Sequence, residues 1–419
     1  MQAATPPSFY GPTVVRAAFV CAVFGWGIGF YGPPIFLHEV VTRTGWPLTL
    51  VSAAVTMHFL VGAALVACLP AIHARIGLAA TTTGGAALLA LGIAGWALAA
   101  QPWQLFAAAA LSGGGWITMG AAAINAIVSP WYARVRPAAL AKAYNGASIG
   151  GVIFTPLWVA LIAQFGFTLA TLAVGLATLT VVGLLSWRVL NKTPLQLGQQ
   201  PDGDAPGSAA SRAGVNAAGA LPGRLLWRDR GFLTLAAAMA LSMFAQIGLI
   251  AHLYVLLVPD LGTQAAGWAI ALATGLAIAG RSVAAWRMGR DADRRLLACA
   301  NYALQAAGTL ALLAAGEGQT ASILAGVLLF GAGIGNTTSL PPLVAQAEFA
   351  REDIPRVVAL IVAMAQASYA FAPAVFALLL TLGGSAGRIG AGTGAFFCAV
   401  LLVQAGAITC MLAGRRGPG

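Results

Sequence analysis

The chain has 419 residues, of which 59% are hydrophobic and only 8% are charged, and its mean hydropathy is +0.86. A soluble domain carries about 25% charged residues to cover its surface, so this composition excludes a water-soluble globular protein. The net charge of +11 would suit nucleic-acid binding. However, the basic residues stand in short segments between apolar runs, where they orient membrane helices. We therefore expect a multi-pass protein of the lipid bilayer, with no nucleic-acid partner.

Apolar runs of about 20 residues, long enough to cross a bilayer as helices, follow one another along the chain. We expect twelve, at 14–36, 48–72, 79–99, 103–129, 138–163 and 166–190, then at 232–257, 265–287, 295–315, 320–346, 356–382 and 390–413. The intervening polar stretch is rich in Gly, Ala, Pro and Ser and is predicted to be a flexible linker. The predicted organisation is a six-helix bundle over 1–190, a linker over 191–231 and a second six-helix bundle over 232–419.

Basic residues predict the orientation. Of 22 Lys and Arg residues, 19 fall on the side of the linker and both termini, two (Arg43 and Arg388) fall on the other side, and Arg281 lies within a span. Leaving out the five linker residues still gives 14 against two. Because cytoplasmic loops are enriched in Lys and Arg, we expect both termini in the cytoplasm of a bacterial-type inner membrane.

The two halves of the sequence resemble each other. Each contains a Gly-rich span, a short basic loop with a proline (Pro137 or Pro355) and a further span with a Phe-x-Pro motif, at 154–156 and 371–373. Repeated halves are typical of transporters that bind substrate at the interface between the repeats. The alternative is that Gly-rich helices resemble one another by composition alone.

Arg281 lies inside a predicted span, six residues before Arg287 near its end. All eleven acidic residues fall in loops or at the ends of spans, so none is placed to pair with it. A charge at this depth is costly unless it is paired or hydrated. We expect an anionic substrate as its partner, because the planar guanidinium suits a carboxylate. The alternative is that Arg281 snorkels to headgroups about 9 Å away.

Other polar side chains within spans are candidates to line the same substrate cavity. They are Tyr31, Asn125, Tyr144, Asn145, Gln246, Asn336 and Tyr369. In the span 138–163, the residues Tyr144, Ser148, Gly151 and Thr155 recur at helical spacing and form one polar, small-residue face. Each of these side chains could equally form hydrogen bonds between helices.

His58 and His252 are candidates for proton coupling, because they lie within spans and imidazole titrates near neutral pH. Both could instead be packing residues, and the substrate carboxylate could carry the proton itself. The five cysteines stand singly in apolar runs, and the sequence has neither a metal-type cluster nor a Walker motif. We therefore expect no cofactor, no metal and no enzymatic activity.

The segment SPWYARVRPAALAKAYNGASIGGVIFTPLW at 129–158 resembles the monocarboxylate transporter and oxalate–formate antiporter branch of the major facilitator superfamily. The matching residues are Trp131, Tyr132, Arg134, Arg136, Pro137, Gly146, Gly150, Gly151 and Pro156. Arg281, preceded by Gly280, is similar to the substrate-binding arginine of this branch, and the Gly-rich aromatic run at 25–34 is similar to its N-terminal signature. The resemblance implies the major facilitator fold, with two pseudo-symmetric bundles, and transport of a small organic anion.

Three departures limit what the resemblance implies. Ala277 stands where animal-type monocarboxylate carriers have an acid, so their proton relay does not transfer. The span 356–382 lacks the lysine of the oxalate carrier, and the loop at 73–77 lacks the acid that the superfamily usually has there.

We expect secondary active transport of a small organic monoanion, monocarboxylate-like and coupled to protons as a symport, by alternating access. The alternatives are a transporter of neutral or cationic drug-like solutes, with Arg281 structural, and a membrane sensor. The low-complexity linker argues against the sensor.

Overall fold

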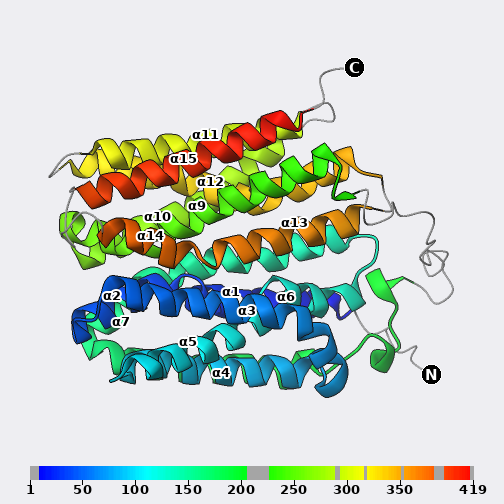
Figure 1. Cartoon of the computed structure of the whole chain (residues 1–419). Coiled ribbons are helices and arrows are strands. Elements are labelled where there is room, and N and C mark those ends of the chain that lie inside the picture. The colour runs from blue at the N-terminus through cyan, green and yellow to red at the C-terminus, as the bar shows by residue number, and fades with distance from the viewer. Residues whose placement is uncertain are drawn as a thin grey trace, which may run out of the picture.

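The computed structural model describes residues 9–204, 226–287, 293–315, 319–350, 353–381 and 391–415. These residues form two groups of long, nearly parallel helices, coloured blue to teal and green to red in Figure 1. The first helix begins and the last helix ends at the same end of the molecule. We call this the linker end, and the other the opposite end.

The described part of the first half contains seven α-helices, because two of its six spans are interrupted and the last two are joined in α7. They are α1 (Gly11–Gly29), α2 (Gly32–Thr44), α3 (Leu48–Ile76), α4 (Leu78–Leu98), α5 (Pro102–Trp116), α6 (Ala121–Val128) and α7 (Arg136–Leu185). The bend at Phe30 and Tyr31 separates α1 from α2, and Pro33 and Pro34 lie in the first turn of α2. Proline is tolerated there because the first N–H groups of a helix have no intrahelical partner.

α7 crosses the bilayer twice. A straight helix of 50 residues would be about 75 Å long, more than twice the thickness of the hydrocarbon core. Its path turns at Gly166, where φ is 78° and ψ is 163°, a conformation that glycine adopts without steric cost. Eleven helices in the described part are long and apolar enough to cross a membrane, with α7 counted once. The turn at Gly166 makes the crossings twelve, and the predicted helical fold is confirmed.

The second half contains α9 (Arg230–Leu261), α10 (Thr263–Arg287), α11 (Arg294–Ala314), α12 (Thr320–Glu348), α13 (Ile354–Tyr369), α14 (Ala372–Thr381) and α15 (Ala391–Ala413). Its penultimate span bends between α13 and α14, as the first span bends between α1 and α2. The outermost predicted positions of the last two spans, 382 and 390, lie outside the described residues, as does Arg388.

The predicted linker begins as a folded segment. It contains two short 3-10 helices, Leu195–Leu197 and Pro201–Gly203, and the second lies against the loop before α7. The Asp202 carboxylate accepts a hydrogen bond from the backbone N–H of Arg134 at 2.7 Å, and Arg134 pairs with Asp204 at 3.2 Å. Residues 205–225 lie outside the described part of the chain.

Exposed tryptophans near both ends of the bundles fit the aromatic belts of a membrane protein. Trp103 and Trp268 lie near the opposite end, and Trp187, Trp227 and Trp286 lie near the linker end. Small residues let the helices between these belts approach closely. A Cβ atom at Gly280 of α10 would lie 1.9 Å from the carbonyl oxygen of Ala332 of α12, so this close packing requires glycine.

Candidate functional site

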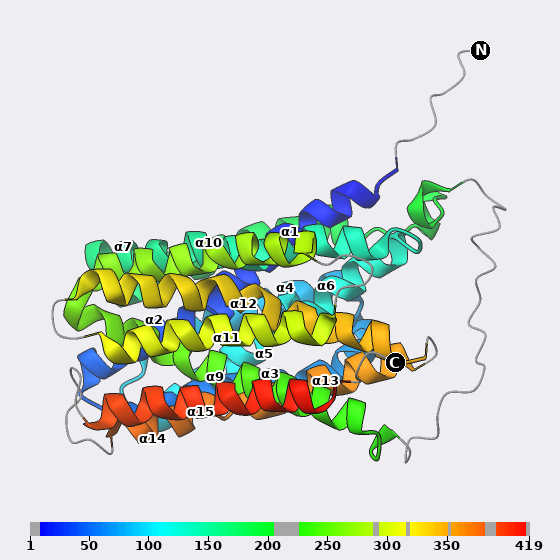
Figure 2. The ribbon, with the colours of Figure 1, turned by 90° about the horizontal axis from the view of Figure 1, so that it is seen from above.

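Arg281 lies at the interface between the two bundles, where α10 packs against α7 (Figure 2). Its Nη2 donates a hydrogen bond of 2.6 Å to the Ser148 hydroxyl on α7, and Ser148 is buried. Gly335 of α12 lies beneath the guanidinium, since a Cβ atom there would be 2.5 Å from Arg281 Nε. The side chain therefore crosses to the first bundle instead of snorkelling to the headgroups at the linker end.

No carboxylate in the described part of the chain pairs with Arg281. The ion pairs found there join Arg134 to Asp204, Arg295 to Glu348 and Arg415 to Asp293. The Nε atom of Arg281 is buried and has no hydrogen-bond acceptor among the described residues. Leaving a buried donor of a charged group without an acceptor is expensive, so the guanidinium has strong capacity to bind a further acceptor.

Tyr31, at the bend between α1 and α2, belongs to the same cluster. Its buried hydroxyl interacts with the Thr274 side chain and with the charge of Arg281. Gly151 of α7 lies against both neighbours, because a Cβ atom there would be 2.6 Å from Tyr31 Cε2 and 2.6 Å from Thr274 Cγ2. The Arg281 guanidinium, the hydroxyl groups of Tyr31 and Thr274, and Gly151 therefore form one cluster. Both bundles contribute residues to it.

Asn336 lies beside this cluster on α12. Its Nδ2 donates to the carbonyl oxygen of Gly280 at 3.1 Å, next to the backbone of Arg281. Sequence reasoning did not select Thr274, although it precedes Arg281 by seven residues and so lies on the same face of α10. Ser148 belongs to the polar face predicted for the span 138–163, but its bond to Arg281 required the tertiary structure.

Three other predicted cavity residues belong to α6 and α7 of the first bundle. The Tyr144 hydroxyl donates to the Ala121 carbonyl at 2.8 Å, and Asn125 Oδ1 accepts from the Ser129 hydroxyl at 2.9 Å. Both contacts lie in the first bundle towards the linker end. The Asn145 side chain is exposed. The contacts of Tyr144 and Asn125 therefore differ from those that define the Arg281 cluster.

Gln246 and Tyr369 also form other contacts. Gln246 Oε1 accepts a bond of 2.7 Å from Gln305 Nε2 inside the second bundle. The Tyr369 ring packs edge-on against Phe59, with 5.9 Å between ring centroids. Tyr369 thus lies at the interface of the bundles, whereas Gln246 joins helices within one bundle.

The two candidate histidines differ in what they join. Nε2 of His58 lies 2.8 Å from the Gly29 carbonyl, and Nδ1 lies 2.9 Å from the Ser112 hydroxyl. Because a carbonyl can only accept, Nε2 carries the hydrogen and Nδ1 accepts from Ser112. Both ring nitrogens therefore connect helices of the first bundle.

His252 of α9 joins the two bundles. Its Nδ1 donates to the Gly248 carbonyl at 3.0 Å, which leaves Nε2 to accept from the Ser52 hydroxyl of α3 at 3.3 Å. This contact lies nearer the opposite end than the Arg281 cluster, since Ser52 is in the first turns of α3.

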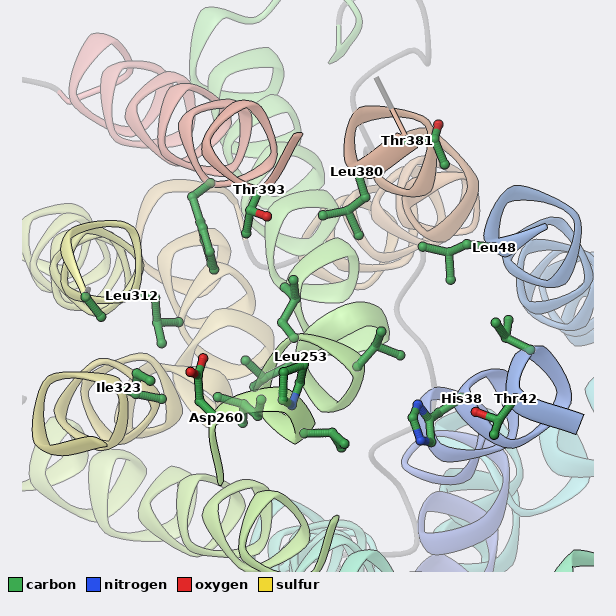
Figure 3. Close-up of a pocket in the computed structure, with 18 of the residues that line it drawn as sticks. His38, Thr42, Leu48, Leu253, Asp260, Leu312, Ile323, Leu380, Thr381 and Thr393 are labelled. Atoms are coloured by element: carbon green, nitrogen blue, oxygen red, sulfur yellow. The ribbon is translucent and has the colours of Figure 1, made fainter. Parts of the chain in front are cut away.

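A cavity of about 550 Å³ lies beyond this contact, at the opposite end. In Figure 3, His38 and Thr42 of α2 and Leu48 of α3 lie across the cavity from Leu253 and Asp260 of α9. Helices of both bundles therefore contribute to its walls, which are mostly apolar.

At the linker end, Asp293 joins the start of α11 to the end of α15. Its carboxylate accepts from the N–H groups of Arg295 and Leu296 at 3.0 Å each and pairs with Arg415 at 2.5 Å. Burial alone would raise the pKa of Asp293, but the bonds from Leu296 and Arg415 outweigh it and hold this pKa below its ordinary value. Asp293 is therefore a charged helix cap outside the membrane-spanning region.

Comparison with known proteins agrees with the membrane-helix fold described above. The family model described as Major Facilitator Superfamily matches residues 17–373. A bacterial homologue of the human lysosomal transporter Spinster, inward-facing and occupied, has a TM-score of 0.71 at 14% identity, covering 100% of both chains. A mutant of the nucleoside transporter NupG has a TM-score of 0.70 at 11% identity, covering 96% of this chain and 98% of its own. At these identities the likeness shows the fold alone. No curated protein matches the sequence.

Proposed function

Because the chain belongs to the Major Facilitator Superfamily, we propose that it is a secondary transporter of a small organic monoanion, which Arg281 binds. Family and fold make the chain a multi-pass membrane transporter and not an enzyme. The monoanionic, monocarboxylate-like substrate and the coupling to protons are our proposal. The likeness to the monocarboxylate branch in residues 129–158 and at Arg281 supports it.

The observation that carries the proposal is the guanidinium between the bundles. It has one hydroxyl partner, Ser148, and a buried Nε without an acceptor in the described part of the chain. A carboxylate would accept two parallel N–H bonds from the guanidinium and neutralise its charge. The Tyr31 hydroxyl, which interacts with Arg281, would provide a further donor.

The bond between Arg281 and Ser148 suggests how binding is linked to alternating access. It joins α10 of the second bundle to α7 of the first. A substrate carboxylate would compete with the serine hydroxyl for the same guanidinium, and charged acceptors form the stronger bonds. Binding would then replace a contact between the bundles and change the relative stability of the inward-open and outward-open states.

For proton coupling, we favour His252 over His58. Protonation of His252 would place a charge on the nitrogen that faces Ser52 in the other bundle, and would change a contact between the bundles. Protonation of His58 would only reverse its bond with the Ser112 hydroxyl, which can donate to the Ala109 carbonyl instead, and this contact within the first bundle need not alter when the bundles rock.

The apolar cavity at the opposite end favours a second candidate function, transport of neutral or cationic drug-like solutes. In that case the bond from Arg281 to Ser148 would be purely structural. For either substrate, the distribution of Lys and Arg supports an inner-membrane orientation with both termini in the cytoplasm.

The test is uptake into proteoliposomes of labelled lactate, propionate and benzoate, with and without an imposed pH gradient. Wild type, Arg281→Ala and the control Arg188→Ala, which alters an exposed arginine at the linker end, are compared against protein-free liposomes. We expect the Arg281 variant to lose uptake and the control to retain it. Normal anion uptake by Arg281→Ala would refute the proposal and favour the second candidate.

A further inference from the structure

Two cavities follow each other along the interface between the bundles. The larger, of about 550 Å³, lies at the opposite end between Leu48 of α3 and Leu253 of α9. The smaller, of about 10 Å³, lies between Val55 and Phe59 of α3 and Ile250 of α9. Since α3 runs inwards from Leu48 and α9 runs outwards to Leu253, the smaller cavity is the deeper one.

The smaller cavity is an apolar constriction. It has room for about one water molecule, and all its lining residues are apolar: Phe30, Pro34, Val55, Phe59, Ile247, Ile250 and Ala251. Both bundles contribute to this lining. A solute that passes between the bundles here must therefore exchange water for hydrocarbon and aromatic surface.

The constriction adjoins Tyr31 of the Arg281 cluster. Phe30, which lines it, precedes Tyr31, and the two rings lie 5.0 Å apart, edge to face. Tyr31 in turn interacts with Thr274 and Arg281. The route from the opposite end is therefore mostly apolar in the larger cavity and wholly apolar at the constriction, and polar groups converge next to the constriction, around the guanidinium.

From this arrangement we infer the substrate class: a monocarboxylate whose body is apolar, aromatic or branched aliphatic, and which carries no hydroxyl groups on that body. The inference rests on the proposed function, because Arg281 binds the carboxylate. The apolar body contacts Phe30, Phe59 and Ile250 while the carboxylate reaches the guanidinium. Hydroxyl groups on the body would lose water there without gaining partners, which is unfavourable for each group.

Cyclohexanecarboxylate and quinate test this inference, because they share one carbon skeleton and one carboxylate and differ in the hydroxyl groups of quinate. Their Kd values are measured by titration calorimetry on the purified full chain. We expect cyclohexanecarboxylate to bind at least about tenfold more tightly. Equal or tighter binding of quinate, or no binding of cyclohexanecarboxylate, would overturn the inference.

Variants of Phe59 test whether the constriction is where the apolar body of the substrate is selected. Phe59→Ser should reduce the ratio of the two Kd values to less than about threefold, mainly by weakening cyclohexanecarboxylate binding. Phe59→Leu keeps an apolar wall and should keep the ratio, as should Phe165→Ser, which alters an exposed aromatic residue. An unchanged ratio in a folded Phe59→Ser protein would show that the constriction does not select the body.

The neutral amide separates this inference from the proposed function. Cyclohexanecarboxamide should bind much more weakly than the carboxylate to wild type, and Arg281→Gln should abolish the difference. If amide and carboxylate bind equally well to both proteins, Arg281 is not the anion site, and the proposed function fails. Even in that case, weaker binding of quinate than of cyclohexanecarboxylate to wild type would still support selection for an apolar body.

Discussion

The Arg281 guanidinium on α10 and the Ser148 hydroxyl on α7 form a hydrogen bond of 2.6 Å between residues 133 positions apart in the chain. This bond connects the two bundles at a part-buried position. The same guanidinium is the proposed anion-binding group, so its contact with Ser148 links substrate binding to the arrangement of the bundles.

Replacing Ser148 with alanine should destabilise the ligand-free protein. The variant leaves the part-buried guanidinium without its hydroxyl partner, at a cost of about 1–3 kcal/mol. The measurement is thermal unfolding in detergent, with and without saturating monocarboxylate. We expect a lowered Tm that ligand restores towards the wild-type value. Ser282→Ala, at an exposed position one residue after Arg281, should change neither value, and an unaltered Tm for Ser148→Ala would contradict the prediction.

Gly335→Ala should displace Arg281. The new methyl group would lie 2.5 Å from Arg281 Nε and 2.5 Å from the Ala277 carbonyl oxygen, so both the side chain and the approach of α12 to α10 must change. We expect uptake of the monoanion to fall at least about tenfold, because misplacing a binding group by about 1 Å is already costly. Gly84→Ala is the matched control, since nothing lies within 4 Å of its added carbon. Wild-type uptake in Gly335→Ala would exclude a positioning role for this glycine.

His252→Gln and His58→Gln should have different effects. The His252 variant removes the titratable contact between the bundles, so its uptake should no longer respond to pH. The His58 variant removes a bridge within the first bundle, so it should lower stability by about 1–3 kcal/mol and retain the response to pH. Uptake measured over a series of pH values, together with thermal unfolding, measures both effects. The reverse pattern would assign proton coupling to His58.

Asp293 should make the stability of the linker end depend on pH in the acidic range. Its pKa in the folded protein lies below the ordinary value of 3.8. Its contribution is therefore fully present above the unfolded pKa and disappears as pH falls through the folded pKa. Asp293→Asn should lower Tm at pH about 7, and the difference from wild type should shrink below pH about 4. A difference that stays constant down to about pH 2 would show that the carboxylate charge is not responsible.

Much of the fold could be predicted because membrane helices are defined locally. Each span must satisfy its backbone hydrogen bonds internally and present apolar side chains to lipid, so a window of about 20 residues contains the necessary signal. The break expected between 163 and 166 corresponds to the turn at Gly166 within α7. The Gly- and Pro-rich run at 25–34 favours a bend in the first span, but the points where single spans divide into two helices, at Phe30 and Tyr31 and at Ala370 and Phe371, were beyond this local signal.

The site was only partly predictable, because contacts between bundles join residues far apart in the chain. Tyr31, Asn336 and Arg281 were expected to lie together, and the structure places them in or beside one cluster. Asn125 and Gln246 were indistinguishable from them by sequence, since an amide within a span can face a cavity or another helix equally well.

The sequence by itself determined that this protein spans the membrane, that it is built from two similar halves, and that Arg281 lies within the bilayer without an acidic neighbour. Composition and spacing suffice for these properties, because the bilayer imposes the same requirement on every span. Only the tertiary structure decided that Arg281 binds Ser148, that Tyr31 lies close enough to feel its charge, and that His252 rather than His58 joins the bundles. These pairings depend on how the helices pack across the interface, and local sequence does not encode that geometry.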